Sequence, residues 1–175
     1  VLSNVKMRGG FGEVHLSVVL ENILAPDQYE MNVKPKSAGS DLVEFAIKLP
    51  GKDDSRKHIW LPVDAKFPKE YYESLQNAYD SADIALIERE QRNLEVAIKN
   101  MAKDISAKYI DPPATTDFAI MFLPFEGIYA EVVRRSSLLE EIQNKYKVLV
   151  TGPTTFAAIL NSLQMGFRTL AIEKR

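Results

Sequence analysis

Two carboxylates and a lysine in the first half of the chain have the side chains needed for metal-assisted cleavage of a phosphodiester. Asp64 and Lys66 are separated by one residue, and Glu44 lies upstream of them. Two carboxylates can hold Mg²⁺ or Mn²⁺ and leave coordination positions for water and phosphate. Such a cation polarises the phosphoryl oxygen, while a neighbouring lysine stabilises charge in the transition state. An Asp-x-Lys tripeptide is common, and taken alone it indicates only a solvated strand face.

The strands predicted to carry these residues place them on one side of a sheet, because side chains alternate between the two faces of a strand. In the stretch 58–67 one face is apolar: Ile59, Leu61, Val63 and Ala65. The other face holds the remaining residues: His58, Trp60, Pro62, Asp64 and Lys66. In the stretch 42–49 the apolar face opposite Glu44 consists of Val43, Phe45, Ile47 and Leu49. If the two strands pair as a hairpin, Glu44, Asp64 and Lys66 converge.

Glu13 adds a third carboxylate, from a predicted helix over residues 13–24. It shares a helical face with Leu16, Leu20 and Leu24. A carboxylate on such a core-facing stripe is costly unless it has a partner, which favours a place in the site. The alternative is a favourable interaction with the helix dipole. The glycine-rich segment 8–12 before it predicts a tight turn, which would also let a DNA phosphate approach closely.

The remaining patterns predict a mixed α/β fold in which helices flank a central sheet. A further strand is predicted over 29–36, and apolar runs at 117–123 and 147–151 are typical of buried strands. Helices are predicted over 69–108 with an interruption near 80–83, over 126–134 and 137–146, and from Pro153 onward. We interpret residues 1–175 as a single domain.

Composition restricts the kinds of site and partner. The chain has no cysteine and two histidines, which excludes thiol nucleophiles and favours a hard cation with oxygen ligands. The formal net charge is -2, so DNA would need a local basic patch. We predict that this patch joins Lys66 with four other lysines: Lys34, Lys36, Lys48 and Lys69. No apolar stretch is long enough to span a membrane, and we interpret the chain as a fragment of a longer protein.

Two features near predicted helix starts have alternative interpretations. Glu126 follows a buried strand and is predicted to begin a helix, whose dipole stabilises a carboxylate. The alternative is that Glu126 supports the site. Thr154 and Thr155 could bind phosphate at a helix N-terminus. Threonines at such positions more often cap the helix, and we favour that interpretation.

Four segments resemble, in order, the RmuC family of DNA recombination proteins. Gly9-Gly10-Phe11-Gly12-Glu13 is similar to the family's Gly-x-(Trp/Phe)-Gly-Glu opening. Val63-Asp64-Ala65-Lys66 resembles its (Ile/Val)-Asp-(Ser/Ala)-Lys segment. Residues 121–126 resemble its Met-Phe-(Ile/Leu)-Pro-x-Glu segment, and residues 148–155 its Val-Leu-Val-Ser-Pro-Thr-Thr stretch with one residue inserted.

The resemblance implies a restriction-endonuclease-like core of the PD-(D/E)xK superfamily. It implies a metal-dependent nuclease with DNA as its partner, which acts in recombination and limits rearrangement at inverted repeats. The implied catalytic residues are Glu13, Glu44, Asp64 and Lys66, with Glu44 and Asp64 as ligands of Mg²⁺ or Mn²⁺. Family members usually carry an N-terminal membrane anchor and a coiled coil. We therefore expect a parent chain on the cytoplasmic side that forms a homo-oligomer through the coiled coil.

One departure from the family supports a second function. The family has Pro-Asp where this chain has Val43-Glu44, and the longer glutamate would shift the metal or weaken its binding. The alternative is thus a non-catalytic DNA-binding or scaffolding module on a degenerate nuclease fold, which a lack of divalent-metal binding would favour. A small-molecule hydrolase on an unrelated α/β fold is a third possibility. It needs a nucleophile elbow, and the chain has no Gly-x-Ser-x-Gly.

Overall fold

One five-stranded mixed sheet, with strands in the spatial order β1-β2-β3-β4-β5, organises the computed structural model, which describes residues 10–51 and 58–173. Strands β1 (Tyr29–Val33), β2 (Val43–Pro50) and β3 (His58–Ala65) pair antiparallel. Strands β4 (Ala119–Phe122) and β5 (Val148–Thr151) continue the sheet parallel to β3. The mixed sheet flanked by helices agrees with the predicted fold class.

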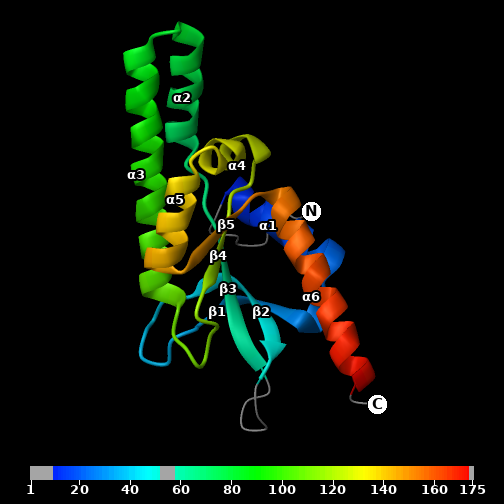
Figure 1. The fold of residues 1–175 in the computed structure, drawn as a ribbon. Coiled ribbons are helices and arrows are strands. Elements are labelled where there is room, and N and C mark those ends of the chain that lie inside the picture. Colours follow the sequence, from blue (N-terminus) through cyan, green and yellow to red (C-terminus); the bar gives the residue numbers. More distant parts are fainter. Residues whose placement is uncertain (1–9, 52–57, 174–175) are drawn as a thin grey trace.

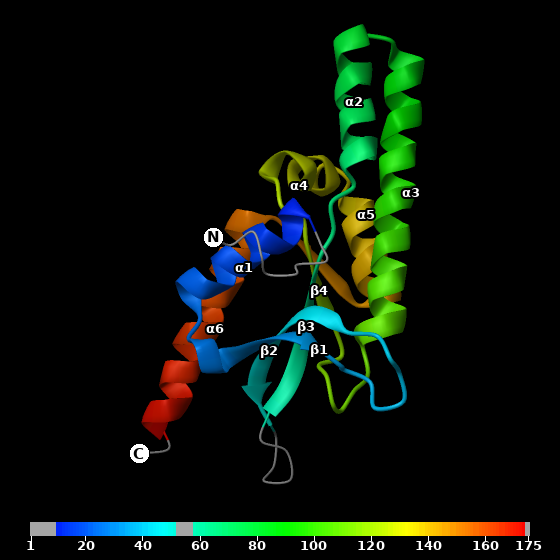
Figure 2. The ribbon, with the colours of Figure 1, turned by 180° about the vertical axis from the view of Figure 1, so that it is seen from behind.

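Helices cover both faces of the sheet (Figures 1 and 2). On one face lie α1 (Phe11–Ile23) and α6 (Pro153–Glu173). On the other lie α3 (Ile84–Tyr109), α4 (Glu126–Val133) and α5 (Ser136–Glu141). Helix α2 (Lys69–Ser81) pairs with α3 in a hairpin that extends beyond the sheet (Figure 1). Short helical turns η2 (Pro26–Gln28) and η3 (Ile142–Tyr146) complete the elements. No described helix has both the length and the apolar character to cross a membrane.

Side chains of β2 and β3 alternate between the two faces of the sheet, as predicted. Phe45, Ile47, Leu61 and Val63 are buried in the core between the sheet, α1 and α6. Val43 departs from this pattern, because it is buried with its cross-strand partner Val33 in the core on the α3 side. In the register of the hairpin Phe45 lies opposite Val63. The next pair toward the start of β2 is therefore Glu44 and Asp64, whose side chains share the α3 side of the sheet.

The structure corrects the turn that we expected over residues 8–12. Helix α1 already begins at Phe11 and includes Gly12, while residues 8 and 9 lie outside the described part of the chain. Gly12 is buried, and a Cβ on it would lie 3.5 Å from the Cβ of Ala65 in β3. Close packing against the sheet thus keeps this glycine helical, despite an intrinsic cost of about 1 kcal/mol relative to alanine.

The expected break in the long helical region is present between α2 and α3. Helix α2 ends at Ser81, and Ala82 follows in the left-handed conformation. Asp83 then caps α3, since its carboxylate accepts a hydrogen bond from the backbone N–H of Leu86 at 3.3 Å.

Candidate metal centre

Three carboxylates meet where β3 ends and β2 begins. Glu44 Oε2 accepts a hydrogen bond from the backbone N–H of Ala65 at 3.2 Å, which fixes the glutamate against β3. The carboxyl groups of Asp64 and Glu13 both lie within hydrogen-bonding reach of the Glu44 carboxyl group. Glu13 reaches this point because the first turn of α1 packs through Gly12 against Ala65. The structure therefore brings together the three acidic residues that strand parity and helix periodicity predicted.

Lys66 connects these carboxylates to α3. Its Nζ lies 3.1 Å from Asp64 Oδ2 and 3.5 Å from Asp104 Oδ2. Its backbone N–H donates to the carbonyl oxygen of Phe122 at 2.9 Å, which holds the lysine at the end of β4. Burial acts to lower the pKa of Lys66, but the carboxylates of Asp64 and Asp104 outweigh it and raise the pKa. The lysine therefore carries its positive charge at neutral pH.

Asp104 and Tyr109, both on α3, belong to the same cluster and were not singled out from the sequence. Asp104 pairs with Lys108 at 3.0 Å as well as with Lys66. Tyr109 is buried, and its pKa is raised by burial and by the surrounding carboxylates, Asp64 first among them. The phenol of Tyr109 thus keeps its proton. The sequence places both residues on or beside the buried stripe of α3. That stripe does not predict which part of the sheet the helix packs against.

The charges of the cluster are unbalanced. Burial, the Asp64 carboxylate and the Glu13 carboxyl group raise the pKa of Glu44 well above that of an ordinary glutamate. Asp64 is 2% exposed. Its Oδ2 atom has no partner with hydrogen-bond geometry among the described residues, although the Lys66 ammonium lies close enough for an ion pair. The site contains more carboxylate groups than the ammonium of Lys66 alone can neutralise.

Carboxylate oxygens are the donor type that a hard divalent cation prefers. Mg²⁺ is usually held by one or two protein carboxylates together with water and substrate phosphate. Among the residues that the structure describes, no group of three or more acidic, cysteine or histidine side chains is arranged to hold a metal ion. The burial of Asp64, whose Oδ2 is contacted by one ammonium, and the raised pKa of Glu44 mark a place where added positive charge is favourable.

The four other lysines predicted to contact DNA do not form one patch around this cluster. Lys69 begins α2, close to the site in sequence and in space, and Lys34 is exposed after β1. The ammonium of Lys36 donates to the carbonyl oxygen of Ala107 on α3.

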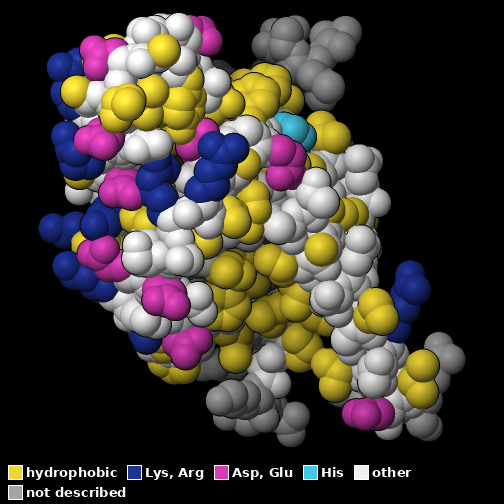
Figure 3. Space-filling view, turned by 45° about the horizontal axis from the view of Figure 1, so that its top comes forward, with side chains coloured by type: hydrophobic (Ala, Val, Ile, Leu, Met, Phe, Trp, Pro, Cys, Tyr) yellow, Lys and Arg dark blue, Asp and Glu magenta, His cyan; other side chains and the backbone are white. Residues whose placement is uncertain are grey.

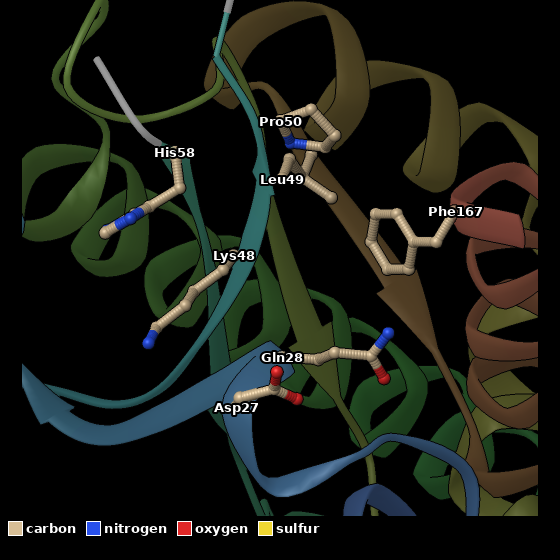
Figure 4. A pocket seen from close by; sticks show the side chains of 7 residues that line it. All are labelled: Asp27, Gln28, Lys48, Leu49, Pro50, His58 and Phe167. Atoms are coloured by element: carbon tan, nitrogen blue, oxygen red, sulfur yellow. The ribbon is translucent and has the colours of Figure 1, made fainter. Parts of the chain in front are cut away.

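Lys48 lies apart from the other predicted DNA contacts, toward the far end of β2. It pairs with Glu30 at 2.9 Å. There it borders a separate hollow, together with Leu49, Pro50 and His58 (Figure 4).

Glu126 caps a helix other than its own. Its Oε1 accepts a hydrogen bond from the backbone N–H of Thr154, in the first turn of α6, at 2.6 Å. Thr155 Oγ1 accepts from the backbone N–H of Gly152 at 2.8 Å. A Cβ at Gly152 would lie 2.9 Å from the Cβ of Tyr129 and 3.1 Å from Glu126 Oε2, so this position requires glycine. Thr155 therefore contributes to the start of α6, as predicted, whereas Glu126 caps α6 and not the helix that it begins.

Comparisons with known proteins agree on one family. The RmuC family model matches residues 1–175. The chain is 52% identical, over all of its 175 residues, to a DNA recombination protein RmuC homolog of Xylella fastidiosa (strain Temecula1), of which it covers 38%. It is 25% identical over 166 residues, 93% of the chain, to a protein of the same name from Chlamydia trachomatis serovar D, of which it covers 35%. The chain thus spans little more than a third of these curated relatives. No solved structure matches it significantly.

Proposed function

This chain belongs to the RmuC family, and we propose that it is the core of a metal-dependent nuclease that cleaves DNA during recombination, with a fold of the PD-(D/E)xK type. The observation that carries the proposal is the meeting of Glu13, Glu44 and Asp64 beside Lys66 at the end of β3. The name of these relatives, DNA recombination protein, supports DNA as the substrate.

Each residue of the cluster has a role that its chemistry allows. Glu44 and Asp64 would hold Mg²⁺ or Mn²⁺, which when bound supplies Lewis-acid polarisation of the phosphoryl oxygen. Lys66 is charged and lies beside Asp64, where its ammonium can stabilise negative charge on the phosphate or orient the attacking water. Glu13 contacts Glu44 and so orients its carboxyl group.

A non-catalytic DNA-binding module is the second candidate, and the burial of Glu44 beside Asp64 and Glu13, which raises its pKa, favours it. With its pKa raised, Glu44 holds a proton at neutral pH, and a cation must displace that proton before the carboxylate can coordinate. Cation affinity then decides between the two functions. An aspartate at this position would be shorter and would lie farther from Glu13.

Cleavage assays on duplex, single-stranded and branched DNA with Mg²⁺ or Mn²⁺ test the proposal. We expect metal-dependent cleavage by the unmodified chain and its loss in Asp64→Asn, because an amide binds the cation weakly. Asp117→Asn is the matched control, since Asp117 precedes β4 at the opposite end of the parallel strands. Glu44→Asp should be tolerated or activating. If DNA binds but no substrate is cleaved, even after Glu44→Asp, the scaffolding module is the function.

A further inference from the structure

An exposed aromatic cluster is formed by residues that are close in sequence to the candidate metal centre. Phe11 is two residues before Glu13, and Phe67 directly follows Lys66. The ring of Phe11 is stacked on that of Phe125, with centroids 5.1 Å apart and an interplanar angle of 8°. Phe67 packs edge-on against Phe125, also at 5.1 Å. Phe11 is 54% exposed and Phe125 41%, so aromatic surface remains open to a ligand.

These three rings form one wall of a hollow of about 580 Å³, which we call the aromatic hollow. That size falls within the roughly 300–1,000 Å³ typical of pockets for small organic ligands. The rest of the lining comes from α2 and α4: Lys69, Tyr72, Glu73, Glu126 and Gly127. A Cβ at Gly127 would collide with the hydroxyl of Tyr72, so a larger residue there would require that ring to move.

The aromatic hollow lies at the end of the sheet where the candidate site lies. The starts of α1, α2 and α4 gather at this end, next to the carboxyl ends of β3, β4 and β5 (Figures 1 and 2). In the view that tips this end toward the reader, apolar side chains are exposed at the surface (Figure 3). The aromatic hollow and Lys66 are linked through Phe67, which lines the hollow and directly follows the lysine in the chain.

We propose that the aromatic hollow binds an unpaired nucleobase of the DNA strand whose phosphate reaches the metal centre. This inference rests on the proposed function and names its substrate class: DNA with a single-stranded or frayed segment next to the cleaved bond. Aromatic side chains stack on any base, because every base has a π-face. The bases of an intact duplex are stacked within the helix, so a base must be unpaired to enter such a hollow.

The charges around the aromatic hollow are compatible with a nucleotide. Lys69 at its rim provides an ammonium for a backbone phosphate. Two carboxylates also line the hollow, but both already have partners. Glu73 pairs with Lys69 at 3.9 Å, and Glu126 accepts the hydrogen bond from Thr154 at 2.6 Å. The hydrogen bond to Thr154 reduces the repulsion between Glu126 and a phosphate, and Lys69 partly offsets that of Glu73.

Equilibrium binding in a chelator, which prevents metal-dependent cleavage, tests the inference by fluorescence anisotropy. The probes are a blunt duplex, the same duplex with a short single-stranded overhang, and that overhang with its bases removed as abasic sites. We expect the unmodified chain to bind the intact overhang most tightly. Phe125→Leu should weaken that binding by about 5- to 150-fold, the range expected for one stacked base. The same variant should leave binding to the blunt and abasic probes unchanged.

Three further variants separate stacking from damage to the fold. Phe11→Leu, on a different helix, should reproduce the loss, and Phe125→Tyr should retain binding because it keeps a ring. Phe167→Leu is the matched control, since Phe167 lines the separate hollow of Figure 4.

Equal binding of the intact and abasic overhangs, or full affinity in both leucine variants, would overturn the inference and leave the nuclease proposal standing. A change of oligomeric state in Phe125→Leu would also overturn it, by showing a contact between copies of the chain. A chain that binds none of the probes would overturn the inference together with the proposed function.

Discussion

At the scale of single residues, Asp64 explains why the Asp-x-Lys spacing is useful. A carboxylate that is 2% exposed is stable only with a compensating charge or hydrogen bonds. Residues two positions apart on a strand point to the same face, so Lys66 is placed to supply that charge at 3.1 Å. The ion pair is partial, because Asp64 Oδ2 lacks a hydrogen bond of good geometry within the described chain. The same spacing therefore compensates the buried charge of Asp64 and places the Lys66 ammonium beside it.

Lys66→Ala should separate cation binding from cleavage. Glu44 and Asp64 remain in this variant, so we expect Mn²⁺ binding, measured by calorimetric titration, to be largely retained. Single-turnover cleavage should slow by about 10²–10³, the typical cost of removing one group that stabilises transition-state charge. Lys103→Ala is the control, because Lys103 is an exposed lysine of the same helix as Asp104. Cleavage at an unchanged rate would remove Lys66 from the chemistry.

Asp104→Asn should change the pH dependence of cleavage rather than its maximum. Asp104 is one of two carboxylates that raise the pKa of Lys66 against the effect of burial. Without it the pKa of Lys66 falls, so the lysine loses its charge at a lower pH. The alkaline limb of the pH–rate profile should move to lower pH, with little change near neutrality. A uniform loss at every pH would instead show that Asp104 acts through the fold or binds the substrate.

Glu44→Gln should make the stability of the chelated protein less dependent on pH. Burial and the neighbouring Asp64 and Glu13 raise the folded pKa of Glu44 above its unfolded value of about 4.3. Between those two values the folded state binds more protons than the unfolded state, so the free energy of unfolding falls as pH rises. Glutamine imitates the protonated side chain and removes this contribution. Urea denaturation at several pH values measures it, with exposed Glu70→Gln as the control. Parallel curves for the unmodified chain and Glu44→Gln would contradict the prediction.

At the scale of elements, local periodicity predicted those features of the site that depend on a single segment of the chain. The period of two located Glu44 and Asp64 on one side of the hairpin, and the period of the first helix placed Glu13 on its buried stripe. The helical start at Phe11 was missed because Gly12 is kept in the helix by its contact with Ala65, which lies far away in sequence. The π-helical end of the segment 142–146, with Lys147 in the left-handed conformation, likewise has no periodic signal.

Residues of the site that depend on two distant elements could not be predicted. Asp104 reaches Lys66 only because α3 packs on the face of the sheet toward which Lys66 points. Phe11, Phe67 and Phe125 come from separate segments, and each alone is an ordinary apolar residue. The resemblance to the RmuC family helped because its motifs join such segments, but it included neither Asp104 nor the aromatic hollow.

Glu126→Ala should reduce stability by weakening the start of α6. The carboxylate satisfies a backbone N–H in the first turn of that helix and interacts favourably with its dipole. Because the contact is exposed, we expect a loss of about 0.5–1 kcal/mol, at the lower end of measured capping effects. Urea denaturation measures the loss, and Glu140→Ala, an exposed glutamate on α5, is the control. An equal change in both variants would show that Glu126 contributes only as a surface charge.

At the scale of the whole molecule, charge and topology act together. The carboxyl ends of the three parallel strands, the starts of four helices and the acidic cluster lie at one end of the sheet. Ligands of sheets with parallel strands commonly bind outside those carboxyl ends. Basic and acidic side chains are interspersed on the visible face of the helical hairpin rather than separated (Figure 3). With a net charge of -2, the molecule offers DNA few uncompensated cations.

DNA binding should therefore depend on salt with a modest slope. Each phosphate neutralised on duplex DNA contributes about 0.9 to the slope of log affinity against log salt concentration, through released counterions. Lys69 lies at the rim of the aromatic hollow and Lys34 is exposed, whereas Lys48 is paired with Glu30 far along β2. We expect two to four contacts and a slope of about −2 to −4.

Lys69→Ala should reduce the magnitude of this slope by about 1, as expected for the loss of one phosphate contact. Lys145→Ala, whose lysine lies in η3 before β5 at the opposite end of the parallel strands, should leave the slope unchanged. Anisotropy titrations at a series of salt concentrations measure all three slopes. Affinity that does not change with salt would mean that phosphates are not contacted, and DNA would then not be the partner of this surface.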